Sequence, residues 1–348
     1  MDPLVLLDRT HGELLLAANR ASPIVADFTF VFERAPDFFA WTDLVFDRVR
    51  YGGAFHDGRL VAYAMTGIVE GWTGSRFGPF FYLGDVRVLP AARGERIGER
   101  LAAWLLEGLP PEVTLGYGLV KEGNRPAEHV LATADRRGIR IGMLAPFEAV
   151  SLLLVRRPRF ARSVEVRRAR PEEIPAAAAL LERAHEGRLF APPPGRWILP
   201  GDEVWVALRA GEVAGAITVR DLDRARRVLV LSYSLRGRLL RLAYAAGTRL
   251  FSGGPPLPAP GEPFRALTVR RQAVEGNDPD ILRDLLAAVV EAGIAGGYHL
   301  VHVGFAAYDQ PRPATDAFLA NRFRSTIYSF DRRGDAQLAP PAVDLAMI

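Results

Sequence analysis

Residues 82–101, YLGDVRVLPAARGERIGERL, combine residue types and spacings that suit anion chemistry. Alternating apolar residues predict a strand at Tyr82–Val88, and apolar residues three and four apart predict a helix at Gly98–Leu106. A strand that turns into a helix points the unpaired N–H groups of the first helical turn outward, at the positive end of the helix dipole. Glycines there let an anion approach the backbone. The turn is therefore a candidate phosphate site; the alternative is an ordinary strand-to-helix connection whose glycines serve the turn.

The same turn resembles the pyrophosphate-binding motif of the GNAT acetyltransferases, Arg/Gln-x-x-Gly-x-Gly/Ala after a strand ending in Val-x-Pro. Val88 and Pro90 match the strand end. Arg96 stands where the family usually has glycine, which tightens the approach of a pyrophosphate unless the arginine itself helps to neutralise it. The resemblance implies that coenzyme A is bound by the motif residues Arg93, Gly94, Glu95, Arg96, Ile97 and Gly98.

A second motif lies downstream, where a strand predicted at Val113–Leu119 leads to a helix predicted at Arg125–Ala134. Between them, Asn124 and Ala127 resemble the Asn-x-x-Ala that opens the next GNAT helix. The resemblance implies that both residues lie beside the pantetheine arm. Asn124 is equally explained as a helix N-cap, with a proline tolerated in the first turn. Two motifs in the family's order are what favour the acyl-CoA interpretation, which covers roughly residues 53–155.

Acyl transfer to an amine needs a deprotonated nucleophile and a polarised thioester carbonyl. The resemblance implies that the backbone of Val86 and Val88 contacts the pantetheine and faces the thioester. Asp85 is the candidate general base, because related enzymes often carry an acidic residue there and burial raises a carboxyl pKa. The alternative is that Asp85 caps a turn or pairs with Arg87 or another neighbour.

The general acid is harder to assign. The family's tyrosine usually falls seven residues after the motif asparagine, and that position is Leu131. His129 on the same helix and Tyr117 on the preceding strand are the remaining candidates, and each is also explained as a packing residue. Either the thiolate leaves unaided or the site is non-catalytic.

Composition narrows the other classes of function. With 348 residues, 49% of them apolar, two domains of about 150 residues each are expected. The net charge of +4 is spread along the chain, so nucleic-acid binding is not expected. There is no cysteine, and the six histidines form no ligand pattern, so no metal is expected. No secretory leader or spanning segment is recognisable, which predicts a cytoplasmic protein.

Two similar hairpins indicate an internal duplication. Gly53–Met65 turns at Asp57-Gly58, and Glu203–Val219 turns at Ala210-Gly211. A strand, an amphipathic helix and another strand follow each hairpin. The break near Arg156-Arg157-Pro158-Arg159 then predicts two domains, residues 1–158 and 159–348.

The second half departs from the phosphate motif. After a strand predicted at Ala266–Val269, the loop carries Glu275 and Asp278, and their charge opposes pyrophosphate binding. Asp278 and Pro279 form an N-cap arrangement for the following helix, and a strand is predicted at His299–Phe305. A degenerate partner domain is expected.

An insertion at Val228–Phe251 occurs only in this half. Its stretch Leu235–Leu242 mixes arginines with leucines, which suits a membrane surface, but the stretch is short and contains Gly237. A helix or hairpin covering the second core is expected instead, and membrane contact is not.

The resemblance and the duplication together imply an α/β (α+β) fold of two tandem GNAT-like domains. Each is a mixed twisted sheet flanked by helices, the first splayed between its fourth and fifth strands. The implied function is acyl-CoA-dependent N-acyl transfer, in the simplest case from acetyl-CoA to a primary amine of a small molecule or peptide; a homodimer is compatible with this. Two alternatives remain: a non-catalytic acyl-CoA sensor, and an acyltransferase acting on a lipid or a carrier protein.

Overall fold

The computed structural model describes residues 3–26, 28–74, 76–136, 138–309, 311–334 and 339–347, without the side chains of 133–136. The N-terminal half forms β1 (Val5–Leu7), α1 (Gly12–Arg20), β2 (Ile24–Val25), β3 (Phe28–Glu33), α2 (Ala40–Val45), β4 (Arg48–His56), β5 (Arg59–Trp72), β6 (Phe77–Val88), α3 (Ile97–Glu107), β7 (Leu115–Lys121), α4 (Arg125–Arg136) and β8 (Arg140–Leu153).

The C-terminal half repeats this alternation. It forms β9 (Glu165–Arg168), α5 (Ile174–Ala184), β10 (Glu203–Arg209), β11 (Glu212–Asp221), β12 (Arg227–Tyr233), α6 (Leu235–Phe251), β13 (Pro263–Phe264), β14 (Ala266–Val274), α7 (Pro279–Ala295), β15 (Leu300–Ala306), β16 (Ala320–Asp331) and the 3₁₀ turn η6 (Leu345–Met347). The predicted α/β fold of two GNAT-like halves is confirmed.

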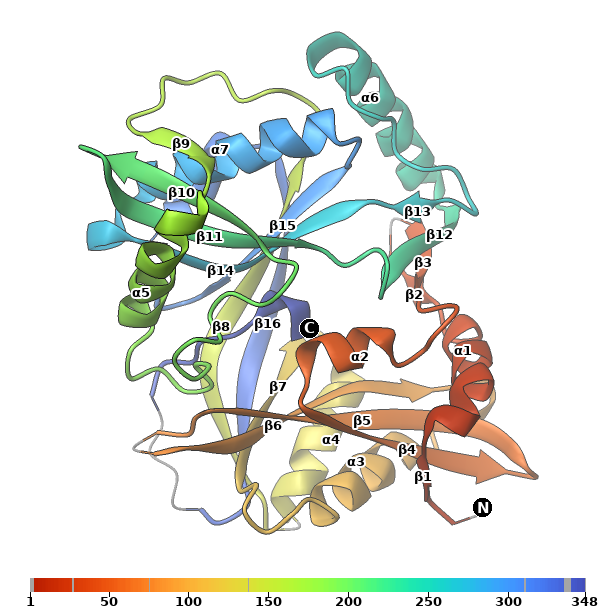
Figure 1. The fold of residues 1–348 in the computed structure, drawn as a ribbon. Coiled ribbons are helices and arrows are strands. Elements are labelled where there is room, and N and C mark those ends of the chain that lie inside the picture. The colour runs from red at the N-terminus through yellow and green to blue at the C-terminus, as the bar shows by residue number, and fades with distance from the viewer. Residues whose placement is uncertain are drawn as a thin grey trace.

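One continuous sheet joins the halves by exchanging a strand (Figure 1). Its order is β1-β4-β5-β6-β7-β16-β8-β15-β14-β11-β10-β9, so β16 lies between β7 and β8, and β8 lies between β16 and β15. A smaller sheet, β13-β12-β3-β2, also mixes strands of both halves. The division after residue 158 stays a prediction about the duplicated unit, because each half completes its sheet with a strand of the other.

The two hairpins of the duplication turn in the same way. Asp57 and Gly58 have φ values of 49° and 72°, and Ala210 and Gly211 have 53° and 85°. Positive φ at both central residues is the type I′ geometry that matches strand twist. Each hairpin is followed by an antiparallel and then a parallel neighbour: β6 and β7 in one half, β14 and β15 in the other.

Helices α3 and α7 fill equivalent places in the two cores. Leu101 and Leu105 of α3 are fully buried, as are Leu285 and Val289 of α7. These are positions that the helical periodicity of the sequence predicts to be apolar and inward-facing. Among the described residues, the helices are too short or too polar to cross a lipid bilayer.

Candidate acyl-CoA site

The site begins where β6 and β7 separate. These parallel strands pair only at Phe81–Gly116 and Tyr82–Tyr117, although β6 runs on to Val88. On its other edge, β7 stays paired with β16. Beyond Tyr82 the backbone of β6 therefore has no strand partner on this side, which makes this edge a candidate binding place for a ligand. This is the splay that the sequence predicts.

A β-bulge lies in β6 at the level of the splay. Met65 of β5 pairs with Gly84, and Tyr63 pairs with Arg87. Two residues along β5 thus correspond to three along β6. The extra residue is accommodated by Asp85, whose φ is 52°. Bulges bend a strand and redirect its groups. Here the bulge lies directly before Val86, whose side chain is 36% exposed.

The Asp85 side chain turns away from solvent and pairs with arginines. Its carboxylate lies 2.8 Å from Arg34 Nη1 and 3.6 Å from Arg87 Nε, and it is only 5% exposed. Burial alone would lower the pKa of Arg34, but the charge of Asp85 raises it above the ordinary arginine value. The pairing with Arg87 is the alternative foreseen for Asp85. Its role as a base stays a prediction.

The turn before α3 brings the helix start against the end of β6. A Cβ atom at Gly98 would lie 3.2 Å from Val88 Cγ2 and 3.4 Å from Val86 Cγ1. The three residues are thus neighbours, as the motif requires. Arg96 precedes the helix with φ 57°, and its side chain does not cap the first turn. Its guanidinium instead pairs with Glu99 at 2.9 Å.

The left-handed conformation of Arg96 explains why glycine is usual at this place. Only glycine adopts such a φ without a steric penalty. Gly94 is also left-handed, with φ 91°. Arg93, Gly94 and Glu95 are exposed, whereas Ile97 and Gly98 are buried. The candidate anion-binding turn therefore has residues 93–96 at the surface and Ile97 in the core.

Asn124 caps α4, which packs against α3. The Oδ1 atom of Asn124 accepts from the Ala127 N–H at 3.4 Å, and its main-chain oxygen accepts from the same N–H at 3.0 Å. Asn124 and His129 are exposed, whereas Leu131, where the family has its tyrosine, is 8% exposed. The N-cap interpretation of Asn124 is thus seen directly, and contact with pantetheine stays a prediction.

Tyr117 is buried at the junction of the halves. Its ring lies 5.3 Å from that of Tyr82 and 4.7 Å from that of Phe190, and its hydroxyl donates to Met347 Sδ at 3.5 Å. Burial raises the pKa of Tyr117. Since η6 is remote in sequence, no local pattern predicts that it reaches Tyr117. The same holds for Arg34, which lies 51 residues before Asp85 and belongs to no motif.

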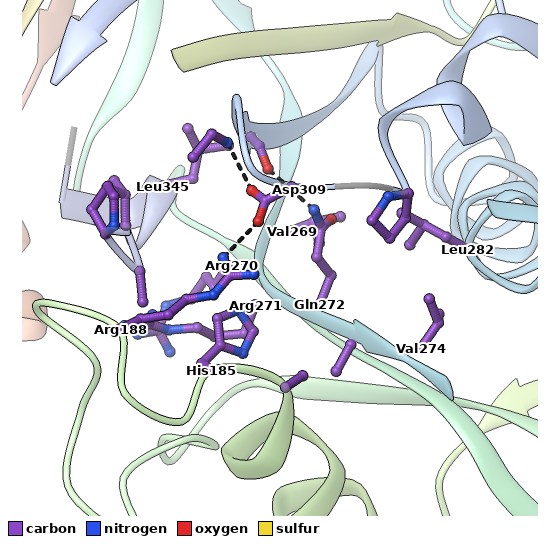
Figure 2. A pocket seen from close by; sticks show the side chains of 18 of the residues that line it. His185, Arg188, Val269, Arg270, Arg271, Gln272, Val274, Leu282, Asp309 and Leu345 are labelled. Atoms are coloured by element: carbon purple, nitrogen blue, oxygen red, sulfur yellow. Dashed lines mark hydrogen bonds and ion pairs between the residues drawn. The ribbon is translucent and has the colours of Figure 1, made fainter. Parts of the chain in front are cut away.

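The equivalent place in the second half is built differently. At the start of α7, Asp278 Oδ1 accepts from the Asp280 N–H at 2.9 Å, and its other oxygen lies 3.1 Å from Arg209 Nη2. The predicted N-cap is confirmed, and a carboxylate of the chain already occupies this helix start. Beyond Thr268 and His302, β14 and β15 also diverge, and a cavity of about 50 Å³ lies there (Figure 2). Among the described residues, no cluster suits a metal ion.

The chain resembles known proteins in sequence over part of its length and in fold over nearly all of it. Residues 19–133 match the Acetyltransferase (GNAT) family. N-myristoyltransferase of Saccharomyces cerevisiae with bound myristoyl-CoA is similar over 99% of this chain and 87% of that one, with TM-score 0.57 and 10% identity. A structure of that enzyme with myristoyl-CoA and inhibitors has TM-score 0.58 and 10% identity, over 99% of this chain and 83% of that one. A GCN5-related N-acetyltransferase from Kribbella flavida has TM-score 0.46 and 18% identity, over 94% of this chain and 71% of that one. No curated protein matches in sequence.

The family match lies on the half that holds the splay, the bulge and the open helix start. The likeness to N-myristoyltransferase, at 10% identity, shows a shared fold over nearly the whole chain. Residues 19–133 are therefore a GNAT-family acetyltransferase domain, and nearly the whole chain shares the fold of an N-acyltransferase.

Proposed function

We propose that the protein transfers an acetyl group from acetyl-CoA to a primary amine of a small molecule or peptide, in the splay between β6 and β7. The observation that carries this proposal is the convergence of three features at one place. They are the unpaired edge of β6, the bulge before Val86 and the open start of α3 against Val88.

Each part of acyl-CoA has a counterpart in this arrangement. The pyrophosphate would lie on the amides of the Arg93–Gly98 turn, where the helix dipole favours negative charge. The pantetheine would run along the open edge of β6, between Val86 and Val88 on one side and Asn124 on the other. Backbone N–H groups held by the bulge would then polarise the thioester carbonyl without reorganisation during the reaction.

Aromatic packing supports a short acyl group. The rings of Tyr82, Tyr117 and Phe190 fill the closed end of the splay, with neighbouring centroids 4.7–5.3 Å apart. Tyr117 is 1% exposed. A long chain entering between the strands would have to displace these rings, whereas an acetyl group would not.

The proton transfers are assigned to residues beside the bulge. Asp85 is the proposed base, which would take the proton of the acceptor amine. Its carboxylate lies on the buried side of β6. Tyr117 and His129 are the two proposed sources of a proton for the leaving thiolate. His129 is exposed on α4, and Tyr117 is directed at Met347. Neither is required if the thiolate leaves unaided.

A sensor that binds acyl-CoA without turnover is the second candidate, favoured by Leu131 in the tyrosine position and by Arg96 in the motif. Release of the free CoA thiol, followed with an amine panel and with acyl-CoAs of increasing chain length, separates the two functions. We expect amine-dependent release that is fastest with acetyl-CoA. Binding with no release for any amine supports the sensor, and faster release with a long acyl group refutes the acetyl assignment.

A further inference from the structure

A buried series of charged side chains with more arginines than carboxylates reaches the cavity of the second half through Arg270 and Arg271. Asp202 lies 2.7 Å from Arg220 Nε and 2.6 Å from Arg270 Nη1. Arg270 also pairs with Asp344, whose carboxylate is 3.5 Å from Arg271 Nη2. All five side chains are at most 5% exposed. Three arginines thus share two carboxylates, and Arg271 is at the end of the series.

Arg271 is incompletely paired where it lines the cavity. Within the described part of the chain, its Nη1 atom is buried and has no hydrogen-bond partner. The other charged groups of the cavity wall do not compensate: Arg188 and Asp309 pair with each other at 2.6 Å, and His185 is neutral because burial lowers its pKa to about 3. Since a guanidinium stays charged in proteins, this site lacks one negative charge.

The C-terminal segment of the chain links the cavity to the proposed acyl-transfer site. Leu345 lines it, whereas Met347, two residues later, contacts Tyr117 beside the splay. Two residues span at most about 7 Å of chain. A water needs roughly 10–15 Å³ of such a cavity, so the 50 Å³ present accommodates the two oxygens of a carboxylate.

We propose that the acceptor amine carries a carboxylate, and that Arg271 binds this carboxylate in the cavity between β14 and β15. The proposal rests on the proposed acyl transfer. A planar carboxylate matches the fork of a guanidinium and supplies the missing charge. The second half would then no longer be an inactive repeat but the half that selects the acceptor.

The test compares amines that differ only in this group, such as β-alanine with β-alaninamide and 4-aminobutyrate with its amide. In the full-length protein, we expect the carboxylate form to have at least a tenfold lower KM, with similar kcat. Arg271→Gln should abolish the difference. Arg271→Lys, which keeps the charge but loses the fork, should retain part of it.

Arg220→Gln is the matched control, because it removes one charge from the same buried series but leaves Arg271 in place. It should keep the preference for the carboxylate. Calorimetry with β-alanine in the absence of acyl-CoA tests the cavity separately from turnover. If β-alanine binds but no acyl group is transferred to it, the proposed acyl transfer is refuted and the carboxylate site in the cavity is supported.

Equal KM values for acid and amide in the wild type overturn the acceptor assignment, and so does a preference that survives Arg271→Gln. Tighter binding of inorganic phosphate than of β-alanine overturns the carboxylate assignment. If Arg271→Gln does not fold, the wild-type comparison and Arg271→Lys still decide.

A second, independent observation concerns α6, which projects from the body of the protein (Figure 1). Leu235, Leu239, Leu242 and Leu250 are 77%, 62%, 68% and 73% exposed. At 100° per residue they lie on one face of the helix. The opposite face is the one that contacts the protein, where the Tyr244 hydroxyl donates to the His299 carbonyl oxygen at 2.8 Å. The leucines therefore do not cover the second core, contrary to the expectation from the sequence.

The charges of α6 indicate what covers this face. The helix contains four arginines and no acidic residue, and Arg236, Arg238 and Arg249 flank the leucine stripe on both sides. Packing α6 against its copy in a second chain would place like charges together. An exposed apolar stripe bordered by arginines suits the surface of an anionic bilayer. We infer that α6 lies on such a surface, with its leucines in the acyl boundary and its arginines at the headgroups.

Co-sedimentation with phosphatidylcholine vesicles, with and without phosphatidylserine, tests this inference. We expect binding only with phosphatidylserine, lost at high salt and abolished by the double variant Leu239→Gln/Leu242→Gln. Arg238→Gln should weaken binding roughly fivefold. Leu319→Gln, an exposed leucine away from α6, is the matched control and should bind normally. Equal binding to both vesicles, or a leucine-dependent dimer with no vesicle binding, overturns the inference.

Discussion

Arg96 has a left-handed backbone conformation, with φ 57°, that costs any residue with a side chain roughly 1–2 kcal/mol. Glycine avoids this cost, but its greater freedom in the unfolded chain destabilises the folded state by about 0.5–1 kcal/mol. The exposed Arg96–Glu99 pair adds at most ~0.5 kcal/mol. Arg96→Gly should therefore change the free energy of unfolding by less than about 1 kcal/mol. It should leave acetyl-CoA affinity equal or higher. A tenfold loss of affinity in calorimetry would mean that the arginine itself binds the pyrophosphate.

Asp85 combines a proposed catalytic role with a buried ion pair, and a double variant separates the two. Asp85→Asn leaves the Arg34 guanidinium, 1% exposed, without its carboxylate, which should cost about 3–5 kcal/mol of stability. Adding Arg34→Gln removes the unpaired charge and should restore most of that stability. If Asp85 is the base, turnover stays low in the double variant although its stability returns. Recovery of turnover together with stability would show that the pair only holds the bulge.

At the scale of elements, local patterns in the sequence were sufficient for the first-half motif and the repeat. The type I′ hairpins, the stripes of α3 and α7 and the Asp278 N-cap depend on residues within a few positions of one another, so they could be predicted. The exchange of β8 and β16 could not, because strand pairing across 168–191 residues leaves no periodicity that specifies a partner. For the same reason, the contacts of Arg34 and η6 with the site could not be predicted. The exposure of the α6 leucines could not be predicted either, because it depends on where the helix packs.

The carboxylate of Glu148 links the exchanged strands, and its pKa makes the stability of the fold depend on pH. Glu148 on β8 lies 3.0 Å from Arg322 on β16 and 2.8 Å from Arg312. Burial would raise the pKa of Glu148, but the two arginines lower it below the ordinary glutamate value. The pair therefore stabilises the fold above the unfolded pKa, near 4.3, and this stability is lost as pH falls through the lower folded value. Glu148→Gln should flatten the acid side of the stability profile measured by urea unfolding; an unchanged profile would contradict the assignment.

At the scale of the whole molecule, the two halves are expected to depend on each other for folding. Residues 1–158 without β16 expose facing edges of β7 and β8, and residues 159–348 without β8 expose those of β15 and β16. Each fragment expressed alone should lack a cooperative thermal transition, and co-expression should restore one. A fragment that unfolds cooperatively by itself would show that its half is an autonomous domain.

The central claim is that one chain binds one acyl-CoA, in the N-terminal splay. Gly98→Asp adds negative charge and a Cβ only 3.2 Å from Val88 Cγ2 at the open start of α3. Gly276→Asp changes a residue with open space around it, in a left-handed conformation that aspartate tolerates, beside the α7 start that Asp278 already caps. Gly98→Ala and thermal unfolding of each variant separate the charge from its steric effect.

The most direct measurement is calorimetric titration of the intact protein with acetyl-CoA. We expect one site per chain, abolished by Gly98→Asp and little changed by Gly276→Asp. Two sites per chain, or binding that survives Gly98→Asp but is lost in Gly276→Asp, would contradict it.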